Sequence, residues 1–347
     1  MNVACIEPAK DARWQALLEA HPAGLFHSPP WFRALTDAYG FEVKAYVVSD
    51  PAGTPLGGLP FCEIADALGP RLVSLPFSDA CDPLVASQAS WEALFARLRA
   101  HGVPVHLRCL DDPIAPADER LTTVKRARWQ TLSVDVPPEA QWAGLDGSTR
   151  RAIRKAERCG VEIRALEGSE GLRGFYGLHV ALRKRKYRLL AQPLVFFEAI
   201  ARRFGEADGW FPLGAYLGDR LVAATIYLRW GETLYYKFNA SDVDGLDARP
   251  NNLLVWEGIS LARSLGCRRV DLGPSDDDQP GLIRFKRYFG AAEKELRFLR
   301  YTPPEWQDER GAEARRLLGA LTELFTAPDV PDDVAARAGA LLYRHFS

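Results

Sequence analysis

A lysine stands where a helix should be apolar, and it is the clearest sign of chemistry in this sequence. If residues 281–289 form a helix, Lys286 falls inside the apolar arc made by Leu282, Ile283, Phe285 and Phe289. A buried ammonium group needs a partner. The nearest candidate is Asp271, which in the strand pattern CRRVDLG faces away from its apolar neighbours. The two residues are either a structural ion pair or a charged pair at a ligand pocket, and we assign Lys286 and Asp271 as candidate catalytic residues.

A second set of polar residues lies on neighbouring elements. In the strand pattern TLYYKFNASD, Tyr235, Lys237 and Asn239 share one face, which is either an exposed surface or a ligand-binding face. Ser275 lies in the loop expected after the Asp271 strand, and Asp79 lies in the loop PFSDACDP, where turn formation alone would explain it. If these residues serve a site, the sequence predicts Lys237, Asn239, Ser275 and Asp79 as substrate-binding residues.

One segment of the chain is distinctly basic. Residues 146–188 carry 12 Lys/Arg against 5 Asp/Glu, although the formal net charge of the whole chain is only -1. The helix expected at residues 149–159 places Arg150, Arg154 and Arg158 one turn apart, and a second basic run covers residues 183–188. Both stretches are either solvated surface or an anion-binding face. The near-neutral total favours a small phosphorylated ligand and gives no argument for DNA or an anionic membrane.

The elements that must position these residues fall into two halves. At 347 residues, of which 47% are hydrophobic, the chain is long enough for two domains. Periodicity and turn residues predict one mixed α/β unit over residues 1–137, a linker over 137–148, a second unit over 148–302 and a helical tail over 303–347. The element order of the second unit reads β-α-α-β-β-β-α-β-α-β.

Composition excludes several classes of protein. Six cysteines are scattered and six histidines show no metal-ligand spacing, so we expect reduced thiols and no metal site. The N-terminus lacks the pattern of a signal peptide, and no run of about 18 apolar residues predicts a membrane span. We therefore expect a cytoplasmic protein without a membrane partner.

Several phrases of the sequence resemble the FemAB-like acyltransferases, which are related to the GNAT superfamily. Three segments resemble the C-terminal signature of that family: RPNNLLVWEGISLARSLG, VDLGPS and GLIRFKRYFGA. Segments nearer the N-terminus resemble other parts of its members: FHSPPWFRAL, GGLPF, LVSLPFSDACDPL and STRRAIRKAERCGVEI. The element order of the second half is also that of the GNAT fold. In that fold a mixed sheet splays between its fourth and fifth strands to admit an acyl thioester.

The resemblance implies a fold of the α/β class, an α+β mixed sheet in two tandem GNAT-like (acyl-CoA N-acyltransferase) units. It implies transfer of an acyl group from acyl-coenzyme A (acyl-CoA) to the amine of a small-molecule, sugar or cell-envelope precursor acceptor. Ordinary GNAT enzymes carry a glycine-rich loop before the third helix, where this chain has ARPNNLL. We expect the helix N-terminus to bind the phosphates instead, and we assign to acyl-CoA binding Arg249, Asn251, Asn252, Arg154 and Arg185.

Two alternatives stay open at this point. The donor could be an aminoacyl-tRNA, as in Fem-type aminoacyltransferases, although the second half shows no long coiled-coil arm of the kind typical of peptidoglycan-bridge members. From a different class, the chain could be a non-catalytic binding module in a polysaccharide or natural-product pathway. The sequence also leaves open whether the first unit is catalytic or structural.

Overall fold

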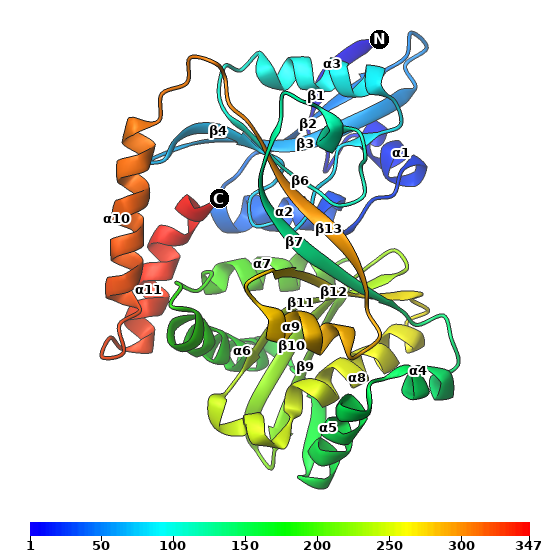
Figure 1. Cartoon of the computed structure of the whole chain (residues 1–347), viewed down its shortest axis with the longest axis vertical. Coiled ribbons are helices and arrows are strands. Elements are labelled where there is room, and N and C mark those ends of the chain that lie inside the picture. The colour runs from blue at the N-terminus through cyan, green and yellow to red at the C-terminus, as the bar shows by residue number, and fades with distance from the viewer. The chain divides into compact units, whose positions relative to one another are not determined.

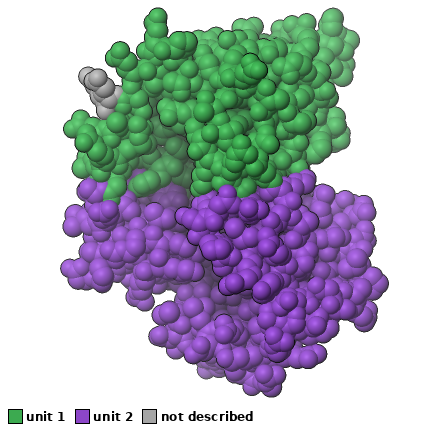
Figure 2. Space-filling view, viewed as in Figure 1, with its two compact units in different colours: residues 1–127, 295–319, 344–347 green, residues 128–294, 320–343 purple. Residues whose placement is uncertain are grey.

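The computed structural model describes residues 1–308 and 311–347 and separates into two compact units (Figure 2). Unit 1 comprises residues 1–127, 295–319 and 344–347, and unit 2 comprises residues 128–294 and 320–343. The domain bounds that we expect from sequence, 1–137, 148–302 and 303–347, differ from those of these compact units and stay a prediction.

Unit 1 is a mixed sheet with helices. Its elements are β1 (Asn2–Ile6), α1 (Ala12–Ala20), the 3-10 turn η1 (Leu25–His27), α2 (Pro29–Tyr39), β2 (Val43–Ser49), β3 (Pro55–Asp66), β4 (Gly69–Val73), β5 (Leu84–Val85), α3 (Gln88–Arg99), β6 (Val105–Cys109), η2 (Ala115–Ala117) and the first part of β7 (Thr122–Ser133). The strand order is β1-β2-β3-β4-β6, followed by β13 (Ala292–Tyr301). Aromatic residues of α3 pack with apolar residues of β3 and β6 in one core.

Unit 2 contains the element order that the sequence predicts. After α4 (Pro138–Gly144) and α5 (Gly147–Arg158) come β8 (Val161–Ala165), α6 (Gly168–Leu182), the π-turn η3 (Arg183–Tyr187), α7 (Leu194–Gly205), β9 (Trp210–Leu217), β10 (Arg220–Trp230), β11 (Thr233–Ser241), η4 (Val243–Ala248), α8 (Pro250–Ser264), β12 (Arg269–Asp276), α9 (Pro280–Arg287) and the start of β13. The strands lie in the order β8-β9-β10-β11-β12-β7. The prediction of a mixed-sheet α/β fold is confirmed.

Helices cover both faces of the unit 2 sheet (Figure 1). On one face, apolar residues of α5 and α8 form a core with β9, β10 and β12. Helix α8 approaches β10 closely because residue 258 is a glycine, and a Cβ there would collide with the Tyr227 ring. On the other face Phe238 packs edge-on against Phe196 and Phe197 of α7. Together these contacts hold α7 and α8 against opposite faces of the sheet.

Some local expectations differ from the structure. The linker expected at residues 137–148 contains α4, which begins after Pro137 and buries Gln141. Strand β12 continues to Asp276, so the loop expected around Ser275 is strand. The basic run at 183–188 forms a π-turn that ends at Arg188 in the left-handed region (φ 54°).

The C-terminal part of the chain contains α10 (Glu309–Phe325), α11 (Asp332–Leu342) and the turn η5 (Tyr343–Phe346). Within the described residues, none of the helices has the length and apolar character needed to cross a membrane.

Candidate functional site

The sheet of unit 2 opens between β11 and β12. The two strands pair in parallel at Thr233–Tyr235 and Arg269–Asp271, and β11 then runs on to Ser241. Helix α8 connects the end of β11 to β12, so its N-terminus lies beyond the point where the pair ends. The divergence that the resemblance predicts between the fourth and fifth strands is therefore present.

Lys237 occupies a β-bulge at this opening. Ile226 of β10 lies opposite Phe238 and Tyr227 lies opposite Tyr236, so Lys237 is the extra residue of the bulge. The bulge reverses the alternation of side chains, and Tyr236 and Asn239 both bond to Thr225. The expectation that Tyr235, Lys237 and Asn239 share one face is therefore wrong, because regular alternation does not continue through a bulge.

Asn239 joins β11 to the start of α8. Its Nδ2 donates to Thr225 Oγ1 (3.0 Å) and to Asn251 Oδ1 (3.2 Å), and Asn251 Nδ2 donates to Ser241 Oγ (3.4 Å). Both amide side chains are thus partly engaged within the protein. The Asn239–Asn251 and Asn251–Ser241 hydrogen bonds attach the first turn of α8 to β11.

Helix α8 begins without a side-chain cap in the described part of the chain. Its N-cap Arg249 adopts a left-handed conformation (φ 62°), and Pro250, which has no N–H, occupies the first helical position. The positive end of the helix dipole is therefore left without a capping carboxylate or hydroxyl.

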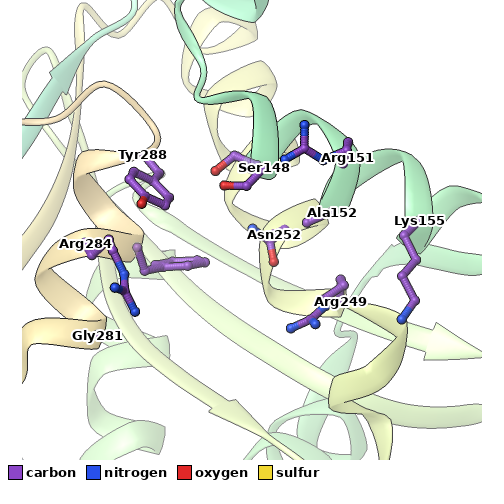
Figure 3. Close-up of a pocket in the computed structure, with 11 residues that line it drawn as sticks. Ser148, Arg151, Ala152, Lys155, Arg249, Asn252, Gly281, Arg284 and Tyr288 are labelled. Carbon is purple, nitrogen blue, oxygen red and sulfur yellow. The ribbon is translucent and has the colours of Figure 1, made fainter.

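This helix end opens on a cavity of about 440 Å³, which we call the basic cavity. Its walls come from α5, α8 and α9, and the residues that line it are Ser148, Thr149, Arg151, Ala152, Lys155, Arg249, Asn252, Gly281, Arg284, Phe285 and Tyr288. Figure 3 shows α9 on one side, α5 on the other and the start of α8 between them. Four lining residues are cationic and none is a carboxylate or histidine, so the cavity favours an anion.

Lys286 is buried, as the apolar arc predicts, and is 3% exposed. Its Nζ donates to the carbonyl oxygens of Gly273 (2.9 Å) and Pro274 (2.8 Å) on β12. Asp271 is 7% exposed, accepts from Trp129 Nε1 (2.9 Å) and from Gly273 N (2.7 Å), and thereby holds the same stretch of β12. These contacts join α9 to β12. The catalytic assignment of Lys286 and Asp271 stays a prediction.

The other predicted residues are divided between the basic cavity and separate surroundings. Arg249 and Asn252 line the cavity. The Arg154 guanidinium lies 5.5 Å from the centre of the Trp142 ring, and Arg185 pairs with Asp332 at 2.9 Å. Buried Ser275 donates to Gln130 Oε1 (3.2 Å), and Asp79 is half-buried in unit 1. The structure therefore brings together only part of the predicted set.

Sequence reasoning missed the residues that complete the cavity, namely Arg151, Lys155, Arg284 and Tyr288. The helical pattern of α5 contains the relevant signal, because Arg151 and Lys155 are four residues apart and therefore share one face. The sequence does not show whether this face of α5 or the face with Arg154 lines the cavity, because that depends on where α8 and α9 pack.

Comparison with known proteins agrees with this geometry. Residues 146–288 match the acetyltransferase (GNAT) domain family. The structure of FemX matches with a TM-score of 0.64 at 14% identity and covers 87% of this chain and 97% of that chain. L-PGS from Bacillus licheniformis matches with a TM-score of 0.55 at 12% identity, covering 90% of this chain and 97% of that one.

A tandem GNAT protein from the clavulanic acid biosynthesis pathway matches with a TM-score of 0.54 at 15% identity and covers 88% of this chain and 100% of that chain. No curated protein matches the chain. At these identities the similar structures establish the fold, and the domain match covers the region that contains the basic cavity. The chain thus has a FemAB-like, tandem-GNAT fold, and its residues 146–288 match the GNAT acetyltransferase domain.

Proposed function

We propose that this chain transfers an acyl group from acyl-CoA, held in the basic cavity of unit 2, to the amine of a small acceptor. The observation that supports the donor most strongly is the convergence of four cationic side chains on the uncapped start of α8. Coenzyme A carries a pyrophosphate and a 3′-phosphate, so its negative charge is complementary to that cavity. Arg249 and Asn252 keep their donor-binding role in this proposal, and Arg151, Lys155 and Arg284 join them.

The chemistry requires an amine to attack the thioester carbonyl carbon, after which the C–S bond breaks. The amine nitrogen loses a proton and the thiolate sulfur gains one. Tyr288 is a source for that second proton, because its phenol lines the cavity. Main-chain N–H groups of β11 near the bulge are assigned to stabilise the oxyanion, because this part of β11 lies at the opening between β11 and β12. In this scheme Lys286 and Asp271 position α9 and β12.

The test is direct binding of acetyl-CoA followed by a free-thiol assay with a panel of amino sugars, amino acids and polyamines. We expect saturable binding that weakens as salt rises, and thiol release that depends on one class of amine. A variant with Arg151→Ala and Arg249→Ala should lose binding while keeping its unfolding midpoint. Absence of binding to acetyl-CoA and to longer acyl-CoA species would refute the proposed donor.

An aminoacyl-tRNA donor is the second candidate, and one observation favours it. The structure with the highest TM-score reported above is FemX, although that likeness concerns the fold alone. Against an extended RNA surface, the second basic run is partly neutralised, because Asp332 pairs with both Lys184 (3.0 Å) and Arg185 (2.9 Å). Protection of unit 2 by charged tRNA but not by acetyl-CoA in thermal unfolding would select this candidate.

A further inference from the structure

Both units contain the same arrangement of strands around a parallel pair. In unit 1 the order is β1-β2-β3-β4-β6, and in unit 2 it is β8-β9-β10-β11-β12. The first four strands of each set pair antiparallel, and the fourth and fifth pair in parallel after a connecting helix, α3 or α8. Unit 1 therefore has the topology from which a second donor site could form.

In unit 1 the chain fills the place of that opening with its own residues 74–82. The β4–β6 pairing ends at Val73 and His106. Ser74 N then donates to His106 O (2.8 Å), and Arg108 N donates to Ser74 Oγ (3.3 Å). Further along, Cys81 forms an antiparallel bridge with Arg108, with its N–H donating to Arg108 O (2.9 Å). The edge of β6 that would border an opening is thus hydrogen-bonded to the segment.

Asp82 extends this closure beyond the end of β6. Its Oδ1 accepts hydrogen bonds from the backbone N–H groups of Leu110 (2.7 Å), Asp111 (3.0 Å) and Asp112 (2.9 Å). Asp82 is buried, with 7% of the residue exposed. A single side chain therefore replaces the strand partner that these three amides would otherwise need.

The segment is part of the unit 1 core. Ser74, Ser78 and Cys81 are buried, and Trp31 Nε1 donates to Ser78 Oγ (2.8 Å). Leu75 (φ 71°) and Phe77 (φ 57°) adopt left-handed conformations that cost free energy and persist only where packing enforces them. Residues held in this way do not form a surface loop that a ligand could displace.

The two connecting helices also begin differently. The Ser87 side chain caps α3 by accepting from Ser90 N (3.2 Å). Helix α8, within the described residues, starts without such a cap and opens on the basic cavity. Only the helix of unit 2 therefore combines an uncapped N-terminus with surrounding cationic side chains.

From these contacts we infer that the chain binds one donor molecule, in unit 2, and that residues 74–82 make unit 1 a closed GNAT-like unit without a donor site. For the identity of the donor, this inference rests on the proposed function. It assigns unit 1 a role other than donor binding.

The first test measures the stoichiometry of coenzyme A binding by calorimetry with the full chain. We expect one molecule per chain. Asn252→Asp places a carboxylate in the first turn of α8, and Ser87→Asp places one at the N-cap of α3, and a negative charge is favourable for helix stability at either position. Asn252→Asp should weaken binding by about tenfold or more, whereas Ser87→Asp should leave it unchanged. Two molecules per chain, or weaker binding in the Ser87→Asp variant, would overturn the inference.

A second measurement needs no ligand, so it separates this inference from the proposed donor. Amide hydrogen exchange should protect Cys81 and residues 110–112 as strongly as the slowest amides of β3, because a closed segment opens only with unit 1 itself. Faster exchange confined to these amides would identify a mobile lid and overturn the inference. If coenzyme A fails to bind but protection is complete, the proposed donor falls and the closed state of unit 1 stands.

Discussion

Replacing Lys286 with methionine should destabilise unit 2 by about 3 kcal/mol. Lys286 is 3% exposed, and its ammonium group donates to two main-chain carbonyls of β12, at 2.9 and 2.8 Å. Losing a charge-assisted hydrogen bond costs about 1.5–3 kcal/mol, and each carbonyl is left without this donor. Methionine keeps the apolar length of the side chain and removes the cost of burying a charge, which offsets part of the loss.

The same change should weaken donor binding without touching the donor. Helix α9 and its C-cap residue Tyr288 form one wall of the basic cavity, and Lys286 attaches that helix to β12. A loosened α9 presents its cavity residues less accurately, so the Michaelis constant for acetyl-CoA should rise. If Lys286 instead acts on the reacting atoms, the turnover number should fall while the Michaelis constant stays constant.

The assay combines urea unfolding followed by circular dichroism with steady-state kinetics below the unfolding transition. Arg284→Met is the matched control, because it removes a cation from the exposed side of the same helix. The control should weaken donor binding with nearly unchanged stability. Unfolding free energy of Lys286→Met within about 0.5 kcal/mol of the parent protein would refute the argument from the two carbonyl contacts.

Three further outcomes follow from the structure. Tyr288→Phe should lower the turnover number and leave the Michaelis constant for acetyl-CoA nearly unchanged, if its phenol supplies the proton to the thiolate. Arg151→Ala should raise that Michaelis constant and flatten its salt dependence, whereas Arg154→Ala, which removes the contact with Trp142, should not. Burial raises the pKa of Asp82 from 3.8 to about 6, so the stability this group contributes below about pH 4 is lost as pH rises towards 6. Asp82→Asn should remove that dependence. The unfolding free energy of the variant minus that of the parent should therefore rise by about 3 kcal/mol from pH 4 to pH 7, which urea unfolding at each pH would measure.

The features that sequence predicts correctly are those with a local physical cause. The sequence predicts that Lys286 is buried because the apolar residues around it recur with the period of a helix, and that pattern is visible within two turns. Helix α2, Pro29–Tyr39, also has bounds with a local cause, since Ser28 caps its start and Gly40 ends it in a left-handed conformation. The element order of unit 2 follows from the same kind of evidence.

The features that sequence missed depend on which surfaces meet. The bulge at Lys237 is a property of the pairing between β11 and β10, and nothing in TLYYKFNASD distinguishes that residue from its neighbours. The basic helix α5 has cationic residues on more than one side, so its composition favours neither Arg151 nor Arg154. Packing decides, because Arg154 lies over Trp142 while Arg151 faces the cavity.

The charge of the basic cavity requires that the helices around it be held in place by other contacts. Four cations from α5, α8 and α9 repel one another when no anion lies between them, and this repulsion acts to separate the three helices. Apolar contacts of Ile153 and Ala156 keep α5 in the unit 2 core, and Lys286 holds α9 on β12. If the proposed donor binds there, its phosphates should relieve this repulsion in a site that is already assembled, so we expect donor binding to weaken as salt rises.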